Sequence, residues 1–158
     1  MPSIPDFPVK AGFSCPILLL ALVLGCSSDS GLGPGDPVLD EMAGVWDARE
    51  FTVTSVAVPS LSFDVVALGG SFRLDIEPSG RYAGSLMLEG VSQTELGVIE
   101  VDGGTLIQTP TNPPGDPVTI EWGMPDDNTL LLDGETEFDF NFDGQTEPAR
   151  VYIDLERR

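Results

Sequence analysis

The chain has 158 residues, of which 26 are acidic and 7 basic, so its net charge at pH 7 is −19. A field of that sign repels nucleic-acid backbones, and we expect no nucleic-acid partner. The chain has no histidine, and Lys10 is its only lysine. This excludes Ser-His and Cys-His catalytic arrangements and histidine-rich zinc or copper sites, and we expect no enzymatic activity.

An apolar run opens the chain. Residues 11–24 are apolar apart from Ser14, which matches the length of the apolar core of a secretory signal. The run is shorter than the roughly 20 residues that span a membrane. It therefore predicts an export signal, with an uncleaved anchor helix as an alternative.

Gly25-Cys26 ends this run and is followed by a segment rich in Ser and Gly. An apolar run that ends in a small residue before a cysteine resembles the lipobox of bacterial lipoproteins. The resemblance implies a signal peptide over 1–25, lipidation of Cys26, and a cell-envelope protein whose partner is the membrane that receives the lipid. Ser27, in place of aspartate, is compatible with the outer membrane. An ordinary cleaved signal with an incidental cysteine is the alternative.

Residues 26–37 are small and polar and predict a flexible tether. The chain has one other cysteine, Cys15, which would leave with the signal. No intramolecular disulfide is then expected, and the domain over 38–158 must be stabilised by apolar burial.

The domain opens with a predicted helical turn over 38–43, which would close one end of the fold. Gly44 then begins a long strand that continues to Val56. Residues 61–68 are compatible with either a strand or a short helix.

Alternation of apolar and polar residues predicts strands with one buried face over 72–76, 118–124, 138–142 and 151–155. Further strands are predicted over 82–88, 93–101, 105–109 and 129–133, between turn signals. Turn residues separate most of these segments. Asp133-Gly134 is expected to end the strand over 129–133, before the phenylalanine-rich segment 138–142. The run 110–117 contains four prolines and predicts an exposed loop, because proline cannot pair within a sheet.

Eight or nine short strands without a crossover helix predict an all-β fold. We expect an antiparallel up-and-down meander that closes into a barrel, since closure removes exposed strand edges. A two-sheet sandwich is the alternative.

Gly44-Val45-Trp46 follows the predicted helical turn and opens the first strand. It resembles the Gly-x-Trp motif of lipocalins and related calycin barrels. The resemblance implies that Trp46 closes the bottom of the barrel and that an arginine near the end of the last strand, Arg157 or Arg158, lies across its ring. Such a cation–π contact is also plausible on physical grounds. The alternative is that Trp46 is an ordinary core residue.

An acidic segment near the C-terminus has the spacing of a calcium loop, with Gly144 at its sixth position. Its oxygen donors are Asp139, Asn141, Asp143, the carbonyl of Gln145, and Glu147. Hard oxygen ligands at this spacing suit Ca²⁺, the one cofactor that the sequence suggests. The alternative is a strand whose polar residues face water and whose Asp143-Gly144 pair forms a hairpin turn.

Aromatic residues on the predicted strands are expected to face the barrel interior. The candidate ligand-binding residues are Trp46, Phe72, Tyr82, Trp122 and Phe140, and Phe138 and Phe142 belong to the same aromatic set. They would line a pocket for a small hydrophobic ligand or fill the core. Bulky rings on short strands favour a filled core.

We therefore expect a lipid-anchored, non-enzymatic envelope protein with a lipocalin-like barrel that binds a small apolar ligand or serves a structural role. A calcium-stabilised acidic surface domain is the first alternative. An enzyme with a carboxylate pair inside the barrel is the second.

Overall fold

The computed structural model describes residues 36–140 and 145–158, which form one short helix and nine strands. The elements are α1 (Pro37–Met42), β1 (Gly44–Ser55), β2 (Ser62–Asp64), β3 (Ser71–Ile76), β4 (Arg81–Leu88), β5 (Val91–Asp102), β6 (Thr105–Asn112), β7 (Val118–Asp126), β8 (Thr129–Phe138) and β9 (Glu147–Arg157).

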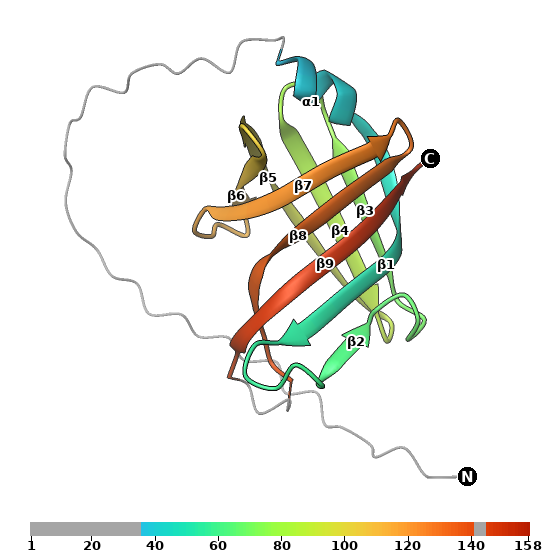
Figure 1. The fold of residues 1–158 in the computed structure, drawn as a ribbon, viewed down its shortest axis with the longest axis vertical. Coiled ribbons are helices and arrows are strands. Elements are labelled where there is room, and N and C mark those ends of the chain that lie inside the picture. Colours follow the sequence, from blue (N-terminus) through green and yellow to red (C-terminus); the bar gives the residue numbers. More distant parts are fainter. Residues whose placement is uncertain (1–35, 141–144) are drawn as a thin grey trace, which may run out of the picture. The chain divides into compact units, whose positions relative to one another are not determined.

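The strands form a closed antiparallel barrel (Figure 1). From β3 to β9 each strand pairs with the next along the chain, and β1 pairs with both β3 and β9, which closes the ring. The short strand β2 is additional: it pairs with the second half of β1, as in Val53 opposite Phe63, whereas β3 pairs with the first half. The predicted up-and-down barrel is confirmed, and the sandwich alternative is wrong.

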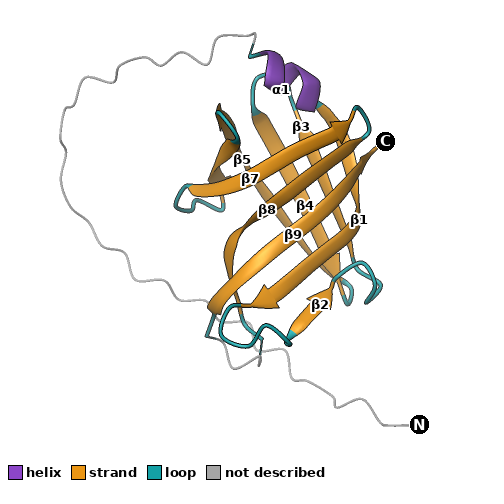
Figure 2. Ribbon diagram, in the orientation of Figure 1, coloured by secondary structure: helices purple, strands orange, loops and turns teal. Residues whose placement is uncertain are grey.

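Helix α1 closes one end of the barrel, as predicted (Figure 2). The carboxylate of Asp36 accepts a hydrogen bond of 2.9 Å from the backbone N–H of Val38, and Pro37 occupies the first turn. An acidic N-cap followed by proline is a favoured way to start a helix. Leu39 and Met42 from this helix are buried in the main core cluster. We call this side of the barrel the closed end and the opposite side the open end.

The apolar core is concentrated toward the closed end. Its buried members are Leu39, Met42, Trp46, Leu74, Ile76, Tyr82, Ile99, Leu106, Leu130, Leu132, Ile153 and Leu155. On the strands they occupy alternate positions, which a pleated strand directs to one face. The alternation read from the sequence therefore identified the inward face of these strands correctly. It was wrong for the described part of 138–142, because β8 ends at Phe138 and Phe140 lies outside any strand.

Strand β6 is longer than predicted and runs through Pro110 to Asn112. Pro110 lies opposite Gly97 of β5 at a register shift. On the other side, β6 pairs with β7 only as far as Gln108. The end of β6 is therefore an edge, where a proline without an N–H group is tolerated. The predicted loop starts at Pro113 instead of Pro110.

Strand β8 runs without interruption through Asp133-Gly134, where the sequence suggested a break. Gly134 pairs with Ile120 on one side and Val151 on the other, so both neighbouring strands hold it in extended conformation. Between residues 61 and 68 a strand of only three residues forms, followed by a turn.

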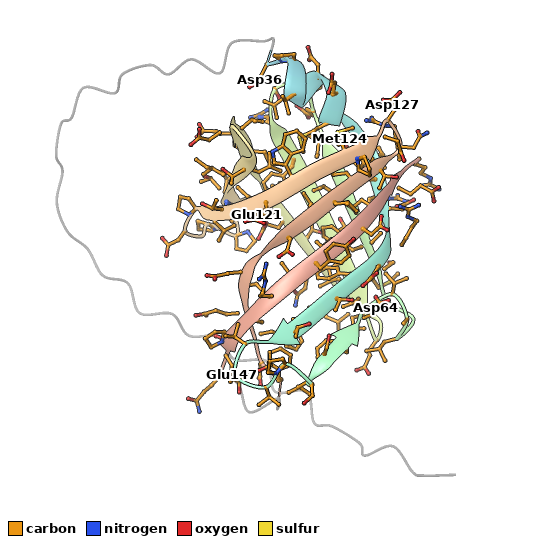
Figure 3. All side chains as sticks on the ribbon, in the orientation of Figure 1. Asp36, Asp64, Glu121, Met124, Asp127 and Glu147 are labelled. Atoms are coloured by element: carbon orange, nitrogen blue, oxygen red, sulfur yellow. The ribbon has the colours of Figure 1, made fainter. Side chains whose placement is uncertain are left out.

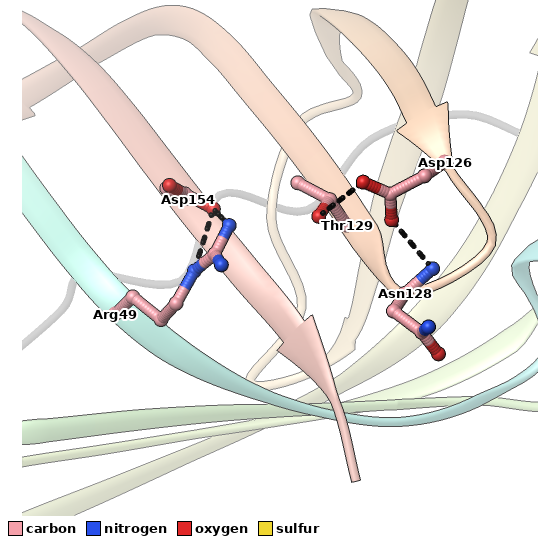
Figure 4. A network of polar contacts seen from close by, with 5 residues as sticks. All are labelled: Arg49, Asp126, Asn128, Thr129 and Asp154. Atoms are coloured by element: carbon pink, nitrogen blue, oxygen red, sulfur yellow. Dashed lines mark hydrogen bonds and ion pairs between the residues drawn. The ribbon is translucent and has the colours of Figure 1, made fainter.

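Arginine–aspartate pairs join neighbouring strands on the outside of the barrel. Arg49 is the extra residue at a bulge in β1, and its Nη2 lies 2.6 Å from Oδ1 of Asp154 on β9 (Figure 4). The Nε of Arg73 on β3 lies 2.8 Å from Oδ1 of Asp47 on β1. Hydrogen bonding to the Arg73 guanidinium lowers the pKa of Asp47 below its ordinary value of 3.8. These pairs connect the strands that meet where the barrel closes.

Several expectations fall outside the described residues: the signal peptide 1–25, lipidation of Cys26, and nearly all of the tether. In the part of the chain that the structure describes, no helix has the length and apolarity needed to cross a membrane.

Candidate ligand-binding cavity

The half of the barrel toward the open end encloses a cavity of about 950 Å³. All eight strands of the ring contribute to its wall, whose apolar part includes Phe51, Phe72, Leu74, Ile120, Leu132 and Ile153. This volume is in the range of small-molecule sites, which are also mainly apolar. The expectation of a filled interior was therefore wrong for this half of the barrel.

Small residues at inward positions explain the space. Gly84 lines the cavity in the middle of β4, where its neighbours on the same face are Tyr82 and Leu86. A Cβ atom added at Gly84 would lie 3.6 Å from the ring of Phe72, in ordinary contact. Ala149 of β9 is a second small residue in the wall. Larger side chains at Gly84 and Ala149 would reduce this space.

The cavity reaches the protein surface at the open end. Its wall includes Val56 and Val118, whose exposed fractions are 56% and 39%. Strand β7 begins late on this side: β6 continues past its pairing with Val118, and β8 continues past Gly134. On this side the wall is completed by exposed residues: Pro113 of the β6–β7 connection, Val118 at the start of β7, and residues 135–137 of β8.

Several exposed aliphatic side chains lie at the open end of the barrel, and one of them, Val56, also lines the cavity. They come from the β1–β2 loop, the segment after β2 and the β4–β5 hairpin, all of which lie at the open end: Val56, Val58, Leu61, Leu68, Met87 and Val91. The approach to the cavity is therefore partly apolar. The acidic side chains labelled in Figure 3 are spread over the described chain, from Asp36 before α1 to Glu147 at the start of β9.

Three polar side chains form a connected group in the cavity wall. The hydroxyl of Tyr82 donates a 2.6 Å hydrogen bond to Oε1 of Glu95. The Nε2 of Gln108 donates to the Tyr82 oxygen at 2.9 Å and to Glu95 Oε1 at 2.7 Å. Pairing of β4, β5 and β6 brings them together. Glu95 of β5 lies opposite Gly84, which is two residues from Tyr82 on β4. Gln108 of β6 is two residues from Pro110, which lies opposite Gly97 of β5.

Tyr82 holds this polar group in place. Its side chain is only 4% exposed, and a Cβ atom on Gly97, its partner across the strands, would overlap the Tyr82 ring. Burial, and then the hydrogen bond to Glu95, raises the pKa of Tyr82 well above its ordinary value of 10.0. The phenol is therefore protonated at neutral pH and acts as a donor to the carboxylate.

Two of the five predicted ligand-binding residues, Phe72 and Tyr82, line the cavity. Trp46 does not, because it is fully buried in the core cluster at the closed end. Trp122 packs against the core outside the cavity wall, and no group in the described chain accepts a hydrogen bond from its buried Nε1–H.

Phe140 belongs to a separate aromatic cluster. Its ring centroid lies 5.1 Å from that of Phe138 and 5.8 Å from that of Phe63, and Phe63 and Phe138 are 5.0 Å apart. All three contacts are edge-to-face, a favourable aromatic geometry. The cluster joins β2 to the end of β8 and is not part of the cavity wall.

The contact predicted between Trp46 and Arg157 is present. The guanidinium carbon of Arg157 lies 4.1 Å from the centroid of the Trp46 ring. The indole N–H of Trp46 donates a 2.9 Å hydrogen bond to the carbonyl of Met42, so the ring is fixed against α1. Gly44 has a φ of +145°, and a Cβ atom there would lie 2.7 Å from Arg157 Nη1. The glycine of the Gly-x-Trp motif thus leaves room for the arginine.

Arg157 also closes the end of the barrel through backbone contacts. It donates hydrogen bonds of 2.6 Å to the carbonyls of Glu41 and Ala43 and one of 2.8 Å to the carbonyl of Asp127. One side chain of β9 therefore connects the end of α1 with the β7–β8 turn.

The predicted calcium loop is only partly described. Asn141 and Asp143 lie outside the described residues. Asp139, Gln145 and Glu147 lie within them, and Glu147 Oε2 accepts a 3.1 Å hydrogen bond from the backbone N–H of Phe140. In the described chain, no group of three or more His, Cys, Asp or Glu side chains is arranged to hold a metal ion. The calcium site stays a prediction.

Sequence reasoning missed Glu95 and Gln108 as site residues. The sequence did contain a signal for Glu95. It is an even number of residues away from Ile99 and Val101, which pack in the core, so on one strand the three side chains point to the same face. A glutamate in phase with core residues indicates a polar group directed inward.

No known family model matches the chain, and no curated protein has a matching sequence.

Proposed function

We propose that this protein is a lipid-anchored envelope protein whose lipocalin-like barrel binds one small, mainly apolar ligand without transforming it. The observation that carries the proposal is the cavity of about 950 Å³, which has a largely apolar wall and reaches the surface at the open end. Burial of apolar ligand surface in such a site is favourable because it removes that surface from water.

The lipocalin-like assignment is supported at the closed end. There Gly44, Trp46 and Arg157 have the arrangement that the resemblance to lipocalins implied. A short helix covers the same end, and the strands are joined in simple up-and-down order. These features leave one end of the barrel for ligand access.

The envelope location depends on Gly25-Cys26 and the apolar run before it. In a bacterial host that lipidates exported proteins, we expect the chain to take up a labelled fatty acid and the Cys26→Ala variant to take up none. Equal labelling of both proteins would contradict lipidation at Cys26.

Binding is tested with a matched pair of glycine substitutions. Gly84→Leu places a side chain in the cavity, whereas Gly123→Leu places the same side chain on β7 where an added Cβ meets no atom within 4 Å. We expect N-phenyl-1-naphthylamine, a neutral fluorescent apolar probe, to bind the full chain and the Gly123→Leu variant with equal affinity. Gly84→Leu should weaken binding by about tenfold or more, because it fills the site.

Circular dichroism serves as the folding control for both variants. Absence of probe binding to the unmodified chain would contradict the proposed function. Equal affinity of the folded Gly84→Leu variant and the unmodified chain would show that the probe binds outside the cavity. This result would also contradict the proposed function.

A further inference from the structure

Apart from Tyr82, the ionisable side chains of the cavity wall are all acidic. Among the described wall residues the ionisable groups other than Tyr82 are Glu95, Glu135 and Glu137, and neither lysine nor arginine contributes. Glu135 and Glu137 are exposed near the opening, whereas Glu95 is partly buried beside Tyr82. The inner end of the cavity thus contains a carboxylate with no cation against it.

The hydrogen bonds of the polar group run between its own members. The Tyr82 hydroxyl has one hydrogen, which it donates to Glu95. The Nε2 atom of Gln108 donates to both Tyr82 and Glu95. The group thus directs its donors toward the Glu95 carboxylate.

Acceptors remain available. Oε1 of Glu95 receives two hydrogen bonds, but Oε2 of Glu95 and the side-chain oxygen of Gln108 receive none from the described residues. Both oxygens belong to residues of the cavity wall and can accept a hydrogen bond from a group that enters the cavity. A ligand that brings a donor to these two oxygens would add hydrogen bonds to an acceptor pair that includes a carboxylate.

We propose that the cavity selects an amphipathic ligand with an apolar body and a hydrogen-bond-donating head group, and that it favours a protonated amine over a hydroxyl. This inference rests on the proposed ligand-binding function and specifies the ligand class. The head group binds between Glu95 and Gln108, and the apolar body lies along Phe72, Leu132 and Ile153. A carboxylate or phosphate head group is disfavoured, because it would lie beside the like charge of Glu95.

The test uses three ligands with the same ten-carbon chain: decylamine, decanol and decanoate. Each ligand is titrated against the complex of the full chain with N-phenyl-1-naphthylamine at pH 7, and displacement of the probe is measured. The ligand concentration is kept below the value at which that ligand forms micelles. We expect decylamine to bind about tenfold or more tighter than decanoate, with decanol between them, since a charge-assisted hydrogen bond is about twice as strong as a neutral one.

Two variants, each lacking one negative charge, distinguish the effect of Glu95 on ligand affinity from the effect of the protein's net charge. Glu95→Gln removes the carboxylate in the cavity. Glu100→Gln makes the same change on β5 at an exposed position between the inward residues Ile99 and Val101. We expect Glu95→Gln to weaken decylamine binding by about tenfold and to change decanol binding by less than about threefold, whereas Glu100→Gln leaves both unchanged.

The outcomes distinguish this inference from the proposed function. If the probe and decanol bind but decanoate binds as tightly as decylamine, the cavity binds ligands and the head-group inference is wrong. The inference is also wrong if Glu95→Gln retains decylamine affinity, or if Glu100→Gln loses as much. If neither the probe nor any of the three ligands binds, the proposed function fails and the inference fails with it.

Discussion

Gly97 lies directly opposite Tyr82, and the Tyr82 ring occupies the space where the side chain of residue 97 would be. A Cβ atom at this position would overlap both the Tyr82 ring and the carbonyl oxygen of Thr109. The backbone oxygen belongs to the paired strand β6 and cannot move away without breaking the pairing. Gly97 is therefore required by close packing, and its φ is not in the left-handed region.

We predict that Gly97→Ala lowers the free energy of unfolding by about 2 kcal/mol, the usual cost of overpacking a tight site. Chemical denaturation monitored by tryptophan fluorescence measures the change. Gly123→Ala is the control, because an added Cβ at Gly123 has no atom within 4 Å. We expect it to be neutral or slightly stabilising. Equal stability of the two variants would show that the strands adjust at Gly97.

The resemblance of Gly44-Val45-Trp46 to the lipocalin motif implied a contact of Trp46 with Arg157 or Arg158, and Arg157 makes it. The sequence did not predict the polar group of Tyr82, Glu95 and Gln108. That group depends on the register of three strands, which is fixed by pairing between segments and not by any local pattern.

At the scale of elements, alternation was sufficient where a strand has one clearly apolar face, as in β3 with Leu74 and Ile76. It failed where proline or glycine occurs inside a strand. Pro110 continues β6 because that edge has no β7 partner, and Gly134 continues β8 because strands on both sides hold it. Neighbouring strands, which the local sequence does not specify, determined both outcomes.

Arg157 joins three elements at the closed end, and we predict that Arg157→Ala lowers the free energy of unfolding by about 2–3 kcal/mol. The reason is the loss of three charge-assisted hydrogen bonds to backbone carbonyls and of the stacking on Trp46. Thermal unfolding followed by circular dichroism measures the loss.

Arg158→Ala is the matched control for this prediction. Its guanidinium lies 3.8 Å from Asp47 in a weak surface contact, and its side chain is 63% exposed. We expect little change in the melting temperature, because exposed ion pairs contribute little. A similar loss in both variants would indicate an effect of net charge and not of the Arg157 contacts.

At the scale of the whole molecule, acidic charge exceeds basic charge by 19 at pH 7. In the described chain, arginine–aspartate pairs at 2.6–2.8 Å join β1 to β9, β3 to β1, and β9 to β8. The arginines are thus placed around the strands that close the barrel. Most of the remaining carboxylates repel one another across the surface.

We predict that raising the NaCl concentration from about 20 mM to about 500 mM increases the melting temperature by roughly 4 °C, because screening relieves repulsion more than it weakens the few exposed ion pairs. Differential scanning calorimetry measures the shift. A lower melting temperature in salt would show that the ion pairs dominate. CaCl₂ at equal ionic strength is the comparison, and a larger increase with CaCl₂ would support the predicted calcium loop at 139–147.

The cavity could not be predicted from composition, because it depends on where small residues fall around the ring. Gly84 and Ala149 are far apart in the sequence, and they contribute to one empty volume because closure of the sheet brings β4 and β9 into the same wall. Among the described aromatic residues that suggested a filled core, Trp46 lies at the closed end, Phe72 and Tyr82 lie in the cavity wall, and Phe138 and Phe140 belong to a separate cluster.

The first and the last described residues, Asp36 and Arg158, both lie at the closed end of the barrel. Asp36 caps the first turn of α1, and the backbone N–H of Arg158 donates a 2.9 Å hydrogen bond to the carbonyl of Val45 at the start of β1. A carrier protein or sensor surface attached through Arg158 would therefore leave the open end of the barrel, where the cavity reaches the surface, unobstructed. Immobilised protein should take up small molecules as readily as protein free in solution.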